Sequence, residues 1–182
     1  MFKYAFFLDS ETLTPENYGK ELKGDGFEGV VYGINSLELA CETAKKLADQ
    51  GFDEIDLCGA FDGEKAKIIK EFAGGKMEVW YETYTAPEEE KFNKLSKLNP
   101  WGIIIHVGAK WGKDAYTLLK SEECDTYIAC VDGMEDTFAA AKKMVAQGVT
   151  FIEICSYYDE GMCNEIIKSI DGAIPVGFPV QA

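Results

Sequence analysis

The chain alternates between short apolar runs and longer amphipathic segments, and this alternation predicts strands followed by helices. Residues 2–8 form an apolar, aromatic-rich run that indicates a first strand. Further along, a stripe of apolar residues at helical spacing predicts a helix from Asn35 or Ser36 to Gln50. The same patterns predict strands over 29–34, 55–58 and 77–81, a helix after Thr14-Pro15-Glu16 and another over 62–73.

The second half of the chain repeats the first at an offset of 97 residues, which becomes 98 near the ends. Identical pairs include Ala44/Ala141, Lys45/Lys142, Gln50/Gln147, Gly51/Gly148, Ile55/Ile152, Cys58/Cys155 and Asp62/Asp159. The chain is therefore interpreted as two diverged copies, 1–83 and 99–182, joined by a charged, partly helical linker over 84–98. In the second copy we expect strands near 102–107, 126–131, 150–155 and 174–178, and helices near 112–120, 134–147 and 160–170.

Regular alternation of strand and helix implies a parallel sheet with right-handed crossovers, and hence an α/β protein made of two tandem (β/α)4-like repeats. Eight strands could close into a minimal (β/α)8 TIM-like barrel, although 182 residues fall below the usual length of about 200. The alternative is two packed four-stranded α/β lobes. The pattern shows no eighth helix, so a barrel would have a seam that a homodimer could cover.

Composition narrows the classes of partner. The chain has 18 Lys+Arg against 32 Asp+Glu, a formal net charge of −14, which disfavours nucleic acid and anionic membranes. No window is long and apolar enough for a membrane span, and the N-terminus lacks the features of a signal peptide. The six cysteines form no C-x-x-C pair and no zinc spacing. We expect a reduced, cytoplasmic protein with a small-molecule ligand.

The segment Glu54-Ile55-Asp56-Leu57-Cys58-Gly59-Ala60-Phe61, followed by a helix and Gly74-Gly75, carries a family resemblance. It resembles an acid-Leu-Cys-Gly-Gly-Phe motif in an uncharacterised family of small bacterial and archaeal α/β proteins, a domain of unknown function about one repeat long. The second copy departs from the motif with Ser156-Tyr157-Tyr158. The resemblance implies a tandem duplication of that domain, and it transfers no catalytic residue or cofactor.

Ligands of α/β proteins usually bind at the carboxyl ends of the strands, so candidate site residues are sought there. Asp56 and Glu153 occupy equivalent strand positions, and alternation turns both away from the helices. His106, the one histidine, ends another strand. In a barrel interior the three would converge as catalytic candidates for proton transfer, or as ligands of a divalent metal. The plainer alternatives are acids bonded at the rim and a histidine buried in the core.

Two further groups of residues are candidate ligand-binding positions. Lys110 and Trp111 lie in a glycine-containing turn before a predicted helix, where free amides and a lysine favour a carboxylate or phosphate. The alternative is a solvated loop with its Trp anchored on the core. Cys58 and Cys155, with Ser156 beside the second, end strands before helices that would lower a thiol pKa. The alternative for both thiols is a place in the core.

The sequence contains no Walker A, dinucleotide-binding, hydrolase-elbow or zinc-protease motif, and it identifies no cofactor. The leading hypothesis is therefore a cytoplasmic protein that binds a small anionic metabolite at the strand carboxyl ends, with acid–base activity of the lyase or isomerase type. The alternatives are a non-catalytic ligand-binding or sensor module and a structural oligomer.

Overall fold

A computed structural model of the chain describes residues 1–108 and 116–182. Contacts divide this part of the chain into two compact units, which are described separately. Unit 1 comprises Met1–Glu82 and Val180–Ala182, and unit 2 comprises Thr83–Pro179. Both units alternate strands with helices, so the predicted α/β class and the two tandem repeats are confirmed.

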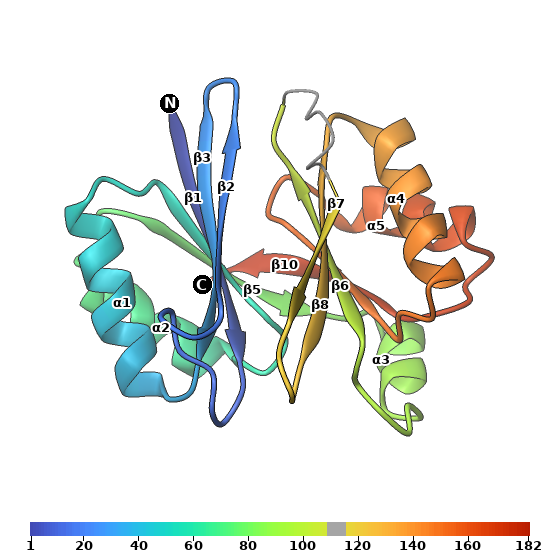
Figure 1. Cartoon of the computed structure of the whole chain (residues 1–182), viewed down its shortest axis with the longest axis horizontal. Helices are drawn as coiled ribbons and strands as arrows, with labels where there is room; N and C mark the ends of the chain where they lie inside the picture. Colours follow the sequence, from blue (N-terminus) through green and yellow to red (C-terminus); the bar gives the residue numbers. More distant parts are fainter. Residues whose placement is uncertain (109–115) are drawn as a thin grey trace. The chain divides into compact units, whose positions relative to one another are not determined.

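Unit 1 is a mixed sheet of strand order β2-β3-β1-β4-β5, with helices α1 and α2 on one side of it (Figure 1). Its elements are β1 (Phe2–Asp9), β2 (Gly19–Gly24), β3 (Phe27–Ile34), α1 (Leu37–Asp49), β4 (Glu54–Leu57), α2 (Gly63–Phe72) and β5 (Glu78–Thr83). All these strands run parallel except β2, which is antiparallel to β3. The amide of Ala182 donates to the carbonyl of Val79 at 3.0 Å, which fixes the chain end beside β5.

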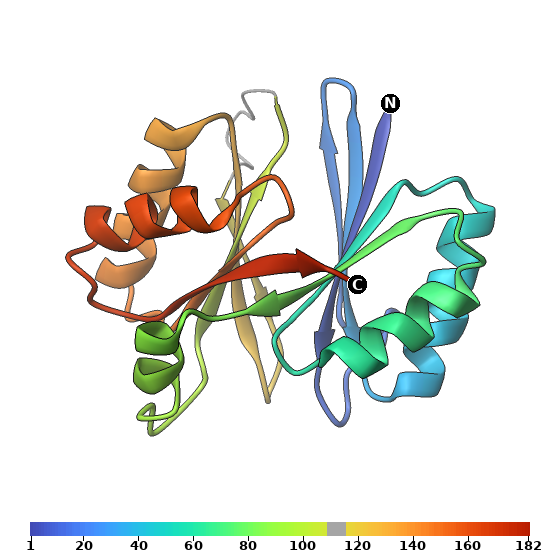
Figure 2. The ribbon, with the colours of Figure 1, turned by 180° about the vertical axis from the view of Figure 1, so that it is seen from behind.

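Unit 2 has the corresponding order β7-β8-β6-β9-β10. Its elements are α3 (Ala86–Phe92), β6 (Trp101–His106), β7 (Tyr116–Lys120), β8 (Asp125–Val131), α4 (Met134–Ala146), β9 (Ile152–Ile154), α5 (Glu160–Ser169) and β10 (Val176–Gln181). Here β7 is antiparallel to β8, and the other strands are parallel. Helices α4 and α5, orange and red in Figure 2, cover the same face of this sheet.

In both units the first strand lies in the middle of the parallel ladder. β1 pairs with both β3 and β4, and β6 pairs with both β8 and β9. The barrel interpretation assumed that strands adjacent along the chain are also adjacent in the sheet. The sequence pattern therefore did not predict this strand order. Each crossover through α1 or α4 passes over the central strand, and right-handed crossovers then place both helices of a unit on one face.

The helix predicted after Thr14-Pro15-Glu16 does not form. The amide of Tyr18 donates to the carbonyl of Thr14 at 2.8 Å, and the Asn17 side chain accepts from the Thr14 amide at 2.7 Å, so only one turn closes. The chain then enters β2, and an Asp25-Gly26 turn leads it back into β3. The strand escaped prediction because Leu22 is its one buried residue, which leaves no alternating apolar pattern.

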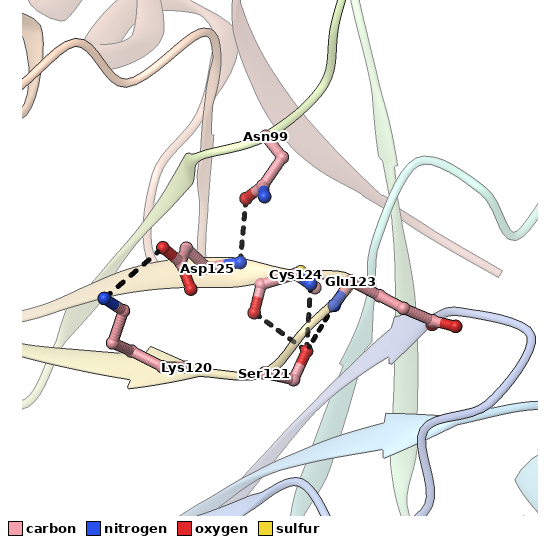
Figure 3. Close-up of polar contacts among 6 residues, drawn as sticks. All are labelled: Asn99, Lys120, Ser121, Glu123, Cys124 and Asp125. Carbon is pink, nitrogen blue, oxygen red and sulfur yellow. Dashed lines mark hydrogen bonds and ion pairs between the residues drawn. The ribbon is translucent and has the colours of Figure 1, made fainter.

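The helix predicted near 112–120 is also wrong where the structure describes it, because residues 116–120 form β7. A side-chain network ties the turn from β7 into β8 (Figure 3). Ser121 Oγ accepts from the amides of Glu123 and Cys124 at 3.2 and 2.9 Å, and Asn99 Oδ1 accepts from the amide of Asp125 at 2.8 Å. The two corrected segments are equivalent, so each repeat has an antiparallel edge strand in place of a helix.

The four long helices begin and end close to the predicted positions. Three of these helices have a side-chain N-cap. Ser36 Oγ accepts a hydrogen bond from the amide of Leu39 at 3.2 Å. In the same way the Asp62 carboxylate accepts one from the amide of Lys65, and the Asp159 carboxylate one from the amide of Met162, both at 2.8 Å. No helix within residues 1–108 and 116–182 is both long enough and apolar enough to cross a membrane.

The predicted linker is part of unit 2. It contains α3, whose Glu88 is buried although the surrounding segment is highly charged. One carboxylate oxygen of Glu88 accepts from the amide of Val176 at 3.1 Å, and the other pairs with Lys91 Nζ at 2.6 Å. These bonds join α3 to β10, so residues 84–98 are not a free connection between the repeats.

Candidate functional site

The two repeats share a backbone framework at the carboxyl ends of their parallel strands. Cys58 Sγ accepts from the amide of Asp9 at 3.3 Å, and Cys155 Sγ accepts from the amide of His106 at 3.2 Å. The amides of the two cysteines bond in turn to Phe7 and Ile104, at 2.9 and 3.1 Å. The two ends can therefore be compared position by position, with His106 equivalent to Asp9.

His106 lies at this end of unit 2, between two other side chains. Its ring stacks on Tyr157, with centroids 3.6 Å apart and planes 8° from parallel. Its Nε2 is 3.9 Å from Asp132 Oδ1, too long for a hydrogen bond but close enough for ionic attraction. The His106 side chain is 17% exposed and that of Asp132 36%. The cluster thus combines a largely buried imidazole, an aromatic stacking partner and a carboxylate open to solvent.

Burial lowers the pKa of His106 below its ordinary value of 6.5, and the Asp132 carboxylate partly offsets this by favouring the imidazolium. The imidazole is therefore mostly neutral at pH 7. A neutral imidazole can accept a proton, and the nearby carboxylate stabilises the cation that results.

The same positions in unit 1 carry different chemistry. Asp9 replaces His106, Asn35 replaces Asp132 and Ala60 replaces Tyr157. Burial raises the pKa of Asp9, with an opposing effect from Lys65. The framework is common to both repeats, so the imidazole cluster is not needed to build the fold. Of the two carboxyl ends, the one in unit 2 therefore carries the side chains that the shared fold does not require.

The start of α4 adds a second difference. In unit 1 the Ser36 side chain caps α1, whereas Gly133 stands at the equivalent place before α4, and no side chain within residues 1–108 and 116–182 caps that helix. Gly133 has a φ of 88°, in the region that favours glycine. Amides in the first turn of α4 therefore lack a side-chain cap directly after Asp132.

Asp56 and Glu153 each have a structural partner. Residue 56 is 0% exposed and residue 153 is 2% exposed. Asp56 accepts a hydrogen bond from the Tyr4 hydroxyl at 2.7 Å, and Glu153 accepts one from the Tyr84 hydroxyl at 3.0 Å. Both acids are thus buried hydrogen-bond acceptors within their own unit.

The predicted convergence of His106 with Glu153 is wrong. The ladder aligns Ile103 with Glu153, so these two side chains share one face of the sheet. His106 lies three residues beyond Ile103, and alternation places it on the opposite face. The barrel-interior interpretation failed because it assigned both residues to the same side of their strands.

The remaining candidates are distributed as follows. Cys58 and Cys155 are buried, and their sulfur atoms accept hydrogen bonds from backbone amides. Ser156, next to Tyr157 in the sequence, is half-buried. Lys110 and Trp111 lie outside the described residues. Across the part of the chain that is described, no group of three or more His, Cys, Asp or Glu side chains could hold a metal ion.

Sequence reasoning missed Asp132 and Tyr157, the two neighbours of His106. Asp132 directly follows β8, and Tyr157 lies three residues after β9. Both replace a residue of different chemistry in the first repeat. A search for positions at which the two copies differ, rather than agree, would have found them. Asp132 had the further signal of preceding a helix start, where polar side chains at strand ends often serve ligands.

We expect the variant Asp132→Asn to lower the pKa of His106 further, because the carboxylate that favours the imidazolium is gone. The shift should be small, since the carboxylate is partly exposed and screened by solvent. An NMR titration of the imidazole protons measures it. The variant Asp125→Asn makes the same change in charge at the hairpin and should leave the pKa unaltered. A rise in the pKa of His106 in Asp132→Asn would contradict the role given to the Asp132 carboxylate.

The chain has low similarity to two solved structures. One is an NtrC family transcriptional regulator from Clostridium acetobutylicum, with 11% identity and a TM-score of 0.31 over 97% of this chain and 86% of that chain. The other is an ABC transporter solute-binding protein from Burkholderia graminis in complex with D-arabinose, with 8% identity and a TM-score of 0.30 over 96% and 74%. Scores this low support no inference about this chain.

The family comparison covers nearly the whole chain, whereas no curated protein matches it. Residues 2–97 match the family of unknown function DUF6506, and residues 100–181 match it again. The repeat read from the sequence is therefore a repeat of a recognised domain. The chain belongs to this family and carries two copies of its domain in tandem.

Proposed function

We propose that the chain binds a small metabolite with an anionic group at the carboxyl ends of β6, β8 and β9, where His106 accepts or delivers a proton. One observation carries this proposal. His106, Asp132 and Tyr157 form a cluster in the second repeat, and on the same backbone the first repeat has Asp9, Asn35 and Ala60. A cluster that the fold does not require is best explained by a ligand.

The anionic part of the proposal rests on the start of α4. Uncapped amides at a helix N-terminus favour a negative group, and they directly follow Asp132. Glu135 and Asp136 in the same turn repel a multiply charged ion. A carboxylate with a single charge is therefore favoured over a phosphate dianion.

The proton-transfer part rests on His106. A neutral imidazole near pH 7 can remove a proton from a carbon next to a carboxylate or carbonyl group, and Asp132 then stabilises the imidazolium. Reactions of this kind are those of isomerases and lyases. Binding without turnover would instead support the non-catalytic ligand-binding alternative.

The test is the melting temperature in glycolate, acetate or phosphate, each compared with chloride at equal ionic strength. At about ten times Kd a ligand stabilises by about 1.4 kcal/mol, or roughly 3–6 °C for a chain of this size. We expect the largest rise with a carboxylate, its loss in His106→Gln and its retention in Asp9→Asn, the equivalent change in the first repeat. An equal rise in His106→Gln, or a loss confined to Asp9→Asn, would refute the proposed site.

A further inference from the structure

Two buried hydroxyl groups link the loops that hold the neighbours of His106. The hydroxyl of Tyr158 lies 2.7 Å from Thr137 Oγ1, and Thr137 Oγ1 donates to the carbonyl of Gly133 at 2.8 Å. Both side chains are buried. The Thr137 proton is used in the bond to Gly133, so Tyr158 must be the donor to Thr137.

These bonds connect the two sides of the His106 cluster. Gly133 directly follows Asp132, and Tyr158 directly follows Tyr157. The link therefore fixes the loop after β8 against the loop after β9, each of which contributes one neighbour of His106. The bond from Thr137 to Gly133 alone would be a common local helix contact, but the bond from Tyr158 spans 21 residues of sequence.

The first repeat shows that the fold does not need this link. Ala40 and Phe61 occupy the equivalent positions and carry no hydroxyl. The amide of Ala40 bonds to Ser36 at 3.0 Å and that of Thr137 to Gly133 at 3.1 Å. The amides of Phe61 and Tyr158 likewise bond to Cys58 and Cys155, at 2.9 and 3.0 Å. The backbone is thus the same with and without the hydroxyls.

We infer that Tyr158 and Thr137 are positioning residues, which hold Asp132 and Tyr157 around His106. The inference rests on the proposed function for its purpose, because it supports the group that would transfer the proton. The geometric part does not depend on that function, since the Tyr158–Thr137 link and the His106 cluster both lie within unit 2. Neither residue needs to touch the ligand.

The double variant Thr137→Ala/Tyr158→Phe recreates the pair found in the first repeat, so we expect it to fold. His106 is the one histidine in the chain, so its imidazole NMR signals need no assignment. A looser cluster admits water to the ring, and because burial is the main cause of its low pKa, the pKa should rise toward 6.5. The imidazole protons should also lose the ring-current shift produced by stacked Tyr157.

Tyr4→Phe serves as the control, because it removes a buried tyrosine hydrogen bond of the same 2.7 Å length in the first repeat. It should lower stability and leave the His106 signals unchanged. Tyr158→Phe alone keeps the bond from Thr137 to Gly133, and it decides the question if the double variant does not fold. We expect the same changes at His106, smaller in size.

Wild-type His106 signals in a folded Tyr158→Phe or double variant would overturn the inference. This outcome differs from failure of the proposed function, in which no anion stabilises the wild-type protein while the His106 signals still respond to the variants. If both proposals hold, the double variant also shows a smaller melting shift in glycolate than the wild-type protein does.

Discussion

Phe7→Ala is expected to destabilise the protein by about 3–5 kcal/mol, as the removal of a fully buried aromatic ring does. Phe7 is 0% exposed and lies on β1, the central strand of unit 1, with Tyr32 and Leu57 as its partners on either side. A loss of this size is a large part of the stability of an ordinary domain. Chemical denaturation followed by circular dichroism measures it.

The control for this prediction is Phe72→Ala, the same substitution on the outer face of α2, where the side chain is 55% exposed. We expect its effect to lie within about 0.5 kcal/mol. Similar losses for the two variants would mean that β1 is not the centre of the sheet and that the strand order of unit 1 is incorrect.

Glu88→Ala is expected to destabilise the protein by about 1.5–3 kcal/mol, the range for a hydrogen bond to a charged group. The change leaves the amide of Val176 without its acceptor and removes the ion pair with Lys91. Lys91 is partly exposed and can turn to water, so most of the cost arises at Val176. The melting temperature and urea unfolding both measure the loss.

Two variants separate the contributions to this effect. Glu88→Gln keeps an oxygen that can accept the hydrogen bond from the Val176 amide, so it should lose less stability than Glu88→Ala. Glu89→Ala alters an exposed neighbour of the same type and should change stability by no more than about 0.5 kcal/mol. Equal effects for Glu88→Ala and Glu89→Ala would show that α3 is a solvated linker, as the sequence suggested.

The hydrophobic pattern predicted most of the fold because the central strands are continuous buried runs and the long helices have one buried face. The central strands and the helices capped by Ser36, Asp62 and Asp159 followed from it, and the tandem repeat followed from identical residues at a fixed offset. The pattern failed at β2 and β7, the edge strands. β2 buries Leu22 alone, and β7 has no buried residue, so neither shows the alternation that distinguishes a strand from an amphipathic helix.

The candidate site was predicted in part. The carboxyl end of β6 and His106 followed from the rule that ligands bind beyond parallel strands. The predicted convergence of Glu153 with His106 was wrong, because the strand register places the two side chains on opposite faces of the sheet. Asp132 and Tyr157 could not be chosen from local pattern, since each reaches His106 through folding of a different loop.

We propose that the ligand site lies at the carboxyl end of the second repeat and not at its counterpart in the first. Backbone amide NMR shifts recorded during a glycolate titration of the wild-type protein test it most directly. We predict that the perturbed amides gather at His106, over residues 132–135 and over residues 155–158. Perturbations centred on Asp9 and residues 58–61, or spread evenly over both repeats, would contradict it.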